Sequence, residues 1–379
     1  FESIGYVGDI DFSDSFFDVF ASEYEDVSDY WVISGDATTD FTGGSGVVEA
    51  VTQDVYVSPD GSDENDGSTE DTPFKHIAFS FSQAYFNSSN IININLLEGT
   101  FAPSTTGEDF PIIMISNINI IGQGEDVTIL DAEETDRVIT IYLCENNIIS
   151  DLAITGGLLE TGDMPPREGG GIYFYESHAS LENVTITGNS ANWGGGIFFF
   201  RDSSSLENVT ISDNSVTGIN GNSYWGQGGG IYIKNLDPDW WTDTYQHPTL
   251  TNVTIANNTA GLGGGMIINR FSHPTLTNIT ISNNTAIGHG GGMYISDGSN
   301  PTLTNVTISG NTAESSNIVG GGGILIWEAD ASLENVNISD NHSVGAGGGG
   351  IFIMGWEGDM GNNANTSLIP HHMNNDGIV

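Results

Sequence analysis

Two sequence blocks determine how this chain folds: Gly169-Gly170-Gly171-Ile172-Tyr173-Phe174-Tyr175, and then Leu181-Glu182-Asn183-Val184-Thr185-Ile186-Thr187-Gly188-Asn189. Both recur from about residue 168 to residue 356, and copies lie 25 to 27 residues apart where the connecting loops are short. The apolar run after the glycines restarts at Ile172, Ile197, Ile231, Met266, Met293, Ile324 and Ile351. Self-similarity at a fixed period of this length indicates a solenoid.

The spacing of apolar residues within one repeat predicts two strands joined by a corner. Ile172 and Phe174 alternate as in a strand, whereas the alternation breaks at Asn183. Asparagine tolerates the left-handed backbone that a one-residue corner needs. Such a unit cannot bury its apolar face alone, so coils must stack about 4.8 Å apart around one core. We expect about nine to ten coils and a ladder of hydrogen-bonded corner asparagines, Asn117, Asn183, Asn208, Asn252, Asn278, Asn305 and Asn335.

Four further stretches resemble the pectate-lyase-like right-handed parallel β-helix superfamily. Residues 56–63 and 73–77 resemble the start of such domains, and 97–101 and 121–124 resemble their first coils. The repeats are also similar to those of polymorphic outer-membrane proteins. This resemblance, over roughly residues 54 to 356, implies an all-β, single-stranded right-handed parallel β-helix. It implies no single function, because lyases, hydrolases, adhesins and fibres share the fold.

The amino-acid composition limits where this protein can work and which partners it can bind. The 379 residues include 50 Asp and Glu but only 6 Lys and Arg, which gives a net charge of −44. This charge repels nucleic acids, anionic membranes and polyanionic polysaccharides that no divalent cation bridges, whereas it attracts Ca²⁺. No apolar run approaches the length of a membrane span, and the single Cys144 excludes an intrachain disulfide. We therefore expect a secreted or cell-surface protein with neither a nucleic-acid partner nor membrane insertion.

The repeat defines three regions. Residues 1–52 are acidic and aromatic, and we expect them to cap the solenoid or to dock on another subunit. Residues 53–356 form the solenoid, with a capping helix expected within residues 76–86. Residues 357–379 are rich in Gly and Asn without apolar periodicity, which is typical of a tail or linker.

The outward positions of the strands that follow the glycines form a largely apolar stripe. Stripes of this size usually mark a covered surface or a binding surface. We favour coverage by the chain's own loops, by residues 1–52 or by a neighbouring subunit, and the alternative is a platform for sugar rings. Its aromatic members are Tyr173, Tyr175, Phe198, Phe200, Tyr232, Tyr294, Trp327 and Phe352, with Trp240 and Trp241 in the insertion 235–247.

Charged residues follow the stripe on each coil. Glu176 should lie beside Arg201, and Arg270 beside Asp297, as weak surface ion pairs. In enzymes of the resembled superfamily the substrate cleft lies on this face. That resemblance suggests a lyase with Arg201 or Arg270 as base and Asp202, Asp237 or Asp297 binding Ca²⁺.

Six basic residues are few for the cation cluster that such a lyase needs. A hydrolase would need a carboxylate pair at a fixed separation, which the sequence cannot single out. Asp60, Asp63 and Asp66 lie in an acidic loop that either binds a structural Ca²⁺ or forms a solvated turn.

We therefore expect first a non-catalytic, secreted or cell-surface structural or adhesive protein that assembles with itself, end to end or laterally, into filaments. The alternative is a carbohydrate-active module that binds an extracellular polysaccharide or cleaves it as a Ca²⁺-dependent lyase or as a hydrolase.

Overall fold

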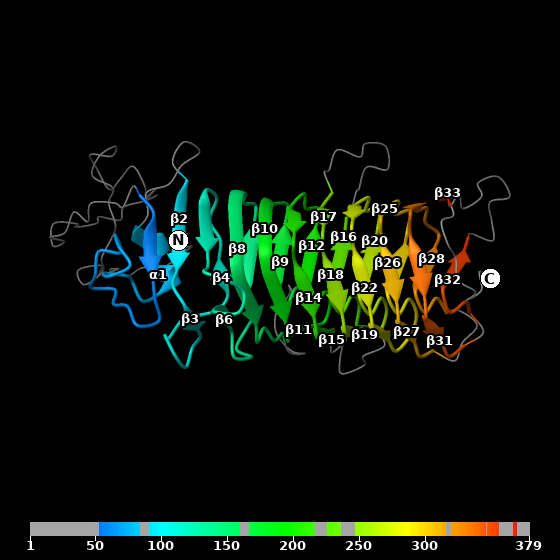
Figure 1. Ribbon diagram of the computed structural model, residues 1–379, viewed down its shortest axis with the longest axis horizontal. Coiled ribbons are helices and arrows are strands. Elements are labelled where there is room, and N and C mark those ends of the chain that lie inside the picture. The colour runs from blue at the N-terminus through cyan, green and yellow to red at the C-terminus, as the bar shows by residue number, and fades with distance from the viewer. Residues whose placement is uncertain are drawn as a thin grey trace, which may run out of the picture.

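A computed structural model describes residues 53–83, 91–159, 167–216, 226–235, 247–315, 320–345, 347–355 and 367–369. The regular secondary structure of these residues consists of strands and one helix, α1 (Ile77–Gln83). The strands lie side by side along one long axis, from β1 near the N-terminal end to β32 near the C-terminal end (Figure 1). Residues 1–52, which we expected to form a cap, lie outside the described part.

One face of the solenoid is a nine-stranded sheet built from the strands that follow the glycine blocks, together with two earlier strands. Every neighbouring pair is parallel and in register, as in Ile172↔Ile197 and Ile197↔Ile231. Nine successive strands are separated by eight turns of the chain, which confirms a right-handed parallel β-helix of nearly the expected length. The strands are β4 (Ile112–Ile113), β7 (Ile139–Tyr142), β9 (Ile172–Tyr175), β12 (Ile197–Phe200), β16 (Ile231–Lys234), β20 (Met266–Asn269), β24 (Met293–Ser296), β28 (Ile324–Trp327) and β32 (Ile351–Met354).

Two further sheets complete each coil. The short one contains β11 (Ser190–Ala191), β15 (Ser215–Val216), β19 (Thr259–Ala260), β23 (Thr285–Ala286), β27 (Thr312–Ala313) and β31 (His342–Ser343). The large one contains β1 (Val55–Val57), β2 (Ile92–Leu96), β3 (Gly99–Phe101), β5 (Ile118–Ile121), β6 (Thr128–Asp131), β8 (Glu145–Thr155), β10 (His178–Thr187), β13 (Ser205–Glu207), β14 (Thr210–Ser212), β17 (Thr249–Thr251), β18 (Thr254–Ala256), β21 (Thr275–Thr277), β22 (Thr280–Ser282), β25 (Thr302–Thr304), β26 (Thr307–Ser309), β29 (Ser332–Glu334), β30 (Asn337–Ser339) and β33 (Ser367–Ile369).

The core is one continuous column of inward side chains. Ile172 and Phe174 alternate inward as predicted, and both are fully buried. The Phe174 ring stacks on that of Phe199 in the next coil, with 4.7 Å between ring centroids. Leu181, which precedes the corner, also belongs to this column. Burying this column removes apolar surface from water along the whole axis. Each Å² of apolar surface buried stabilises the folded state by about 25 cal/mol.

The asparagine corners form a surface row. Asn183, Asn208 and Asn252 have φ of 54°, 56° and 55°, which is the left-handed backbone that the corner requires. Each side-chain amide donates to the side-chain oxygen of the preceding coil, at 2.6–3.2 Å, from Asn183 on Asp151 through Asn335 on Asn305. Asn117 lies outside this row. The β5–β8 register aligns Ile120 with Ile149 and so places Asn117 opposite Asn146, whose amide donates to it.

A second row, six residues further along each coil, is buried. The side-chain oxygen of Asn258 accepts both the backbone N–H and the amide N–H of Asn214, at 3.0 and 3.1 Å. The Asn258 amide also donates to the carbonyl of Ile211 at 3.0 Å. The members of this buried row are Asn189, Asn214, Asn258, Asn284, Asn311 and Asn341. The amides therefore satisfy backbone groups that the solenoid core would otherwise isolate.

The glycine blocks are required by backbone geometry and close approach. Gly228 begins its block with φ of +68°, a conformation that L side chains rarely adopt. A Cβ at Gly230, the third glycine, would lie 2.8 Å from the carbonyl oxygen of Gly265 in the next coil. The block thus turns the chain and lets two backbones pack without side chains between them.

Both ends of the solenoid have features beyond the repeat. Helix α1 lies within the predicted residues 76–86, and Ile77 and Phe81 on it join the core. Near the other end, β33 pairs in parallel with β29, with Ser332 opposite Ser367 and Leu333 opposite Leu368. This strand lies within residues 357–379, which we expected to be a tail. The repeat's Ser-Leu pair recurs at 367–368 without the glycines and asparagines that identify the other copies.

Candidate functional site on the outer face of the nine-stranded sheet

The central part of the outward stripe is buried. Tyr173, Phe198, Tyr232 and Ile267 form a second apolar cluster separate from the main core, and Phe198 is only 1% exposed. Trp193 packs against this cluster, and its ring meets that of Tyr232 edge to face. Of the other predicted members, Tyr294, Trp327 and Phe352 are half-buried. Trp240 and Trp241 lie outside the described residues.

The residue before each glycine block explains how Trp193 reaches the stripe. Glu168, Trp193, Gln227 and Leu262 pair as isolated parallel bridges on successive coils. The first glycine of the block then reverses the chain, so this column lies beside the outward side chains. The sequence offered no clear signal for this arrangement, because the four residue types differ.

A second outward column contains three stacked rings. Tyr142 stacks on Tyr175 at 4.6 Å between centroids, and Tyr175 stacks on Phe200 at 5.2 Å, both with interplanar angles of 20°. Tyr175 lies between the other two rings, so it presents mainly its edge to the surface. Sugar platforms need a free ring face. Of the two end rings, Phe200 has the Arg201 guanidinium and the Lys234 ammonium over it, at 5.6 and 5.8 Å from its centre, whereas Tyr142 is half exposed.

Within the part of the chain that the structure describes, the stripe is most exposed at its N-terminal end. Ile113, Tyr142 and Leu143 are 61%, 51% and 54% exposed, respectively. They come from β4, β7 and the corner after β7, and Ile113 pairs beside Thr140 in the register. We call these three residues the open patch. Sequence reasoning missed it, because no glycine block precedes β4 or β7.

Ionisable groups border the buried stripe. The guanidinium carbon of Arg137 lies 4.8 Å from the centre of the Tyr173 ring, and the ammonium of Lys234 lies 5.4 Å from that of Trp193. Burial raises the pKa of Glu168, and the charges of Lys234 and Arg137 partly offset this. Burial lowers the pKa of Lys234 and of Arg137. Groups with shifted pKa values cluster at functional sites, although ion-pair networks also shift pKa values.

Three of the four predicted catalytic residues that the structure describes lie in one row of corners, and the fourth, Asp202, is buried apart from them. The fifth candidate, Asp237, lies outside the described residues. Arg201 binds Glu176 with 3.2 Å between Nη1 and Oε1, as the predicted surface ion pair. Arg270 and Asp297 are exposed at equivalent corners. Asp202 is 2% exposed and accepts the backbone N–H groups of Ser177 and Ser204, both at 2.8 Å. Asp202 thus serves the backbone from inside the coil, away from the outer face.

The corners that hold these charges share one backbone conformation. Glu176, Arg201, Arg270, Asp297 and Glu328 all have φ between 45° and 54°. They form a left-handed row at the end of the nine-stranded sheet, comparable with the asparagine row. Charged residues give no sequence signal for this conformation, so the row was not predicted.

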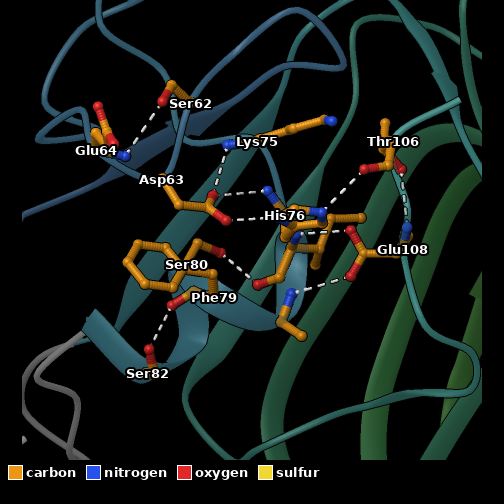
Figure 2. A network of polar contacts seen from close by, with 12 residues as sticks. Ser62, Asp63, Glu64, Lys75, His76, Phe79, Ser80, Ser82, Thr106 and Glu108 are labelled. Carbon is orange, nitrogen blue, oxygen red and sulfur yellow. Dashed lines mark hydrogen bonds and ion pairs between the residues drawn. The ribbon is translucent and has the colours of Figure 1, made fainter. Parts of the chain in front are cut away.

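The carboxylates of Asp63 and Asp66 in the acidic loop accept hydrogen bonds from other groups of the protein. Asp63 accepts the backbone N–H groups of Lys75 and His76 and also contacts the His76 ring (Figure 2). One oxygen of Asp66 accepts hydrogen bonds from Ser68 and Thr72. Asp60 is exposed. In the described part of the chain, no group of three or more His, Cys, Asp or Glu side chains is placed to hold a metal ion.

The comparisons with known proteins agree on the architecture. The family profile "Right handed beta helix region" matches residues 170–366, and a profile described as "Protein of unknown function (DUF1565)" matches residues 59–237. The crystal structure of pectate lyase Pel9A superposes with a TM-score of 0.50 and 13% identity, over 85% of this chain and 83% of that chain.

A rhamnogalacturonan lyase superposes at 0.42 with 16% identity, over 76% of this chain and 77% of the other. Pectin methylesterase PemA from Erwinia chrysanthemi superposes at 0.39 with 12% identity, over 77% and 82%. At these identities the likeness concerns the fold alone. No curated protein matches the sequence. Among the described residues, no helix has the length and hydropathy of a membrane span.

Proposed function

The chain belongs to the right-handed β-helix family, and we propose that it is a secreted protein that binds a neutral polysaccharide at the open patch. The observation that carries the proposal is the exposure of Ile113, Tyr142 and Leu143 at one end of a stripe whose other described members are buried or half-buried. Apolar patches rimmed by polar residues commonly mark binding surfaces. Tyr142 adds an aromatic ring with a hydroxyl group, a combination suited to both stacking and hydrogen bonding.

The charge of the protein favours an uncharged polysaccharide as the ligand. The net charge of −44 disfavours the approach of a polyanion. Arg137 is buried against Tyr173, and Arg201 is paired with Glu176, so neither extends an exposed, uncompensated charge toward the patch. Binding without cleavage fits the pairing of Arg201 with Glu176 and the burial of Asp202 better than a lyase or hydrolase does. Structural neighbours that are carbohydrate-active enzymes are compatible with this proposal but do not carry it.

The test is retention on insoluble neutral and uronate polysaccharides, followed by calorimetry with oligosaccharides of any glycan retained. We expect Tyr142→Ala to weaken binding by about two- to twelvefold, because an aromatic contact contributes about 0.5–1.5 kcal/mol. Tyr142→Phe, which keeps the ring, should retain most of the affinity.

Val344→Ser is the matched control, because Val344 is exposed and lies on the coil of β31, away from the patch. It should bind like the parent protein. Binding to uronates alone, or equal binding by Tyr142→Ala, would refute the proposal. Released reducing or unsaturated ends would instead reveal an enzyme.

A structural or adhesive role is a second candidate, and β32 favours it. This strand ends the nine-stranded sheet, and no described strand pairs with its outer edge. Phe352, Ile353 and Met354 on it are only half-buried. Unpaired edges are templates for association with another chain. Light scattering over a range of protein concentrations tests this role, and a mass that stays monomeric throughout would oppose it.

A further inference from the structure

The His76 ring joins two segments near the N-terminal end of the solenoid. Its Nδ1 lies 2.5 Å from Oδ2 of Asp63, and its Nε2 lies 2.9 Å from the carbonyl oxygen of Thr106 (Figure 2). Asp63 belongs to the loop after β1, whereas Thr106 belongs to the loop after β3. The ring is therefore a bridge between parts of the chain that are 43 residues apart (from 63 to 106).

The chemistry of the two partners fixes the protonation state. A carboxylate and a carbonyl oxygen both accept hydrogen bonds and donate none. Neutral imidazole has one N–H, so it can satisfy only one of them and turns a lone pair toward the other. Only the doubly protonated, positively charged ring donates to both.

Helix α1 begins immediately after this bridge. Its first backbone N–H groups, from Ile77 and Ala78, donate to the two oxygens of Glu108 at 2.9 and 3.2 Å. Glu108 is buried, and it lies two residues after Thr106. Ile77 and Phe81 on the helix pack into the core beside Phe74. The bridge and the Glu108 contacts thus hold the helix and the loop 102–108 together.

We propose that His76 is a pH-sensitive latch. While its ring is protonated, it holds α1 and the loops after β1 and β3 together over the N-terminal end of the core. Loss of the ring proton breaks one of the two contacts and loosens this cap. The remainder of the solenoid does not depend on the ring, because its coils are held by their own ladders.

The groups that face the ring favour its charged form. Burial opposes the charge, but the hydrogen bond and charge of Asp63 and the charge of Glu108 raise the pKa of His76 above its ordinary value. A histidine whose pKa is raised on folding stabilises the folded state below its unfolded pKa, near 6.5. It loses that contribution as the pH rises through the folded pKa. The latch is therefore released as the pH rises through the pKa of His76 in the folded protein.

Hydrogen exchange of the full chain, expressed as protection factors to remove the intrinsic pH dependence, tests the latch. We expect protection of Ile77–Gln83 to fall about tenfold for each unit by which the pKa of His76 exceeds its ordinary value. The fall should occur as the pH rises above 6.5, and protection of β16 and β20 should not change.

Two variants and a titration keep the test decisive. His76→Gln cannot be charged, so its α1 protection should be low and independent of pH. His178→Gln changes an exposed histidine and should behave like the parent protein. NMR titration of the parent's His76 ring covers the case in which His76→Gln fails to fold. A ring pKa at or below 6.5, or pH-independent α1 protection in the parent, would overturn the proposal.

Discussion

Asp202 is a carboxylate that the coil interior holds by backbone hydrogen bonds. Ser177 and Ser204 each donate an N–H to it at 2.8 Å. Burial nevertheless raises the pKa of Asp202 to about 6, and the hydrogen bonds offset only part of this rise. Desolvation therefore exceeds the stabilisation of the anion, and Asp202 is ionised at neutral pH at a cost to the folded state.

This cost predicts that the contribution of Asp202 to the free energy of unfolding depends on pH. An acid whose pKa is raised from 3.8 to about 6 on folding favours the folded state below pH 3.8 and loses that contribution as the pH rises through 6. The loss amounts to about 3 kcal/mol, at 1.36 kcal/mol per pKa unit. The free energy of unfolding of Asp202→Asn, measured by urea denaturation relative to the parent, should therefore rise between pH 4 and pH 7. Asp213→Asn, at an exposed corner, should show no comparable trend, and parallel curves for Asp202→Asn and the parent would contradict the assignment.

At the scale of the repeated element, the two asparagine rows have different roles. The exposed row supplies left-handed corners, and its side-chain contacts compete with water. The buried row supplies acceptors and donors to backbone groups that have no access to water. Unsatisfied buried groups cost about 1–3 kcal/mol each, whereas exposed hydrogen bonds contribute about 1 kcal/mol or less.

Asn252 and Asn258 lie in the same coil and allow this difference to be measured. Asn258→Ala leaves the backbone N–H of Asn214 and the carbonyl of Ile211 without their partners, so it should destabilise the protein by about 2–5 kcal/mol. Asn252→Gly keeps access to the left-handed corner and should cost about 1 kcal/mol or less. Equal losses in chemical denaturation would contradict the assignment of the structural role to the buried row.

The elements also show what could be predicted from sequence. Asn183 predicts its corner because asparagine both breaks the alternation and tolerates positive φ. Arg201 and Asp297 occupy equivalent corners, yet nothing in a charged side chain signals that conformation. Asn117 was misplaced because its local pattern matches the repeat, whereas the β5–β8 register that sets its partner is a long-range property.

The candidate site was less predictable than the fold, for a reason that belongs to the whole molecule. Alternation identifies Tyr173 and Phe198 as outward, but burial depends on the column of Trp193 and Leu262, which is set by bridges between coils. The open patch lies at β4 and β7, before Glu168, the first described residue of that column. A periodic sequence therefore predicts the solenoid, and its irregular positions determine where a ligand can approach.

Net charge is the second property of the whole molecule with a measurable consequence. Six basic residues cannot neutralise fifty acidic ones, so the folded chain carries a large self-repulsion. Raising NaCl from about 10 mM to about 150 mM shortens the screening length from about 30 Å to about 8 Å. The free energy of unfolding at pH 7 should therefore rise with NaCl over this range.

The salt effect should weaken as the pH falls toward the isoelectric point of about 4.1, because protonated carboxylates no longer repel one another. Thermal unfolding in a grid of pH and NaCl concentration separates this effect from specific ion binding, which would saturate at low concentration instead of following the screening length. A melting temperature that falls with salt at pH 7 would show that attractive charge pairs outweigh the repulsion. The few basic residues along the outer face would then contribute more to stability than the net charge implies.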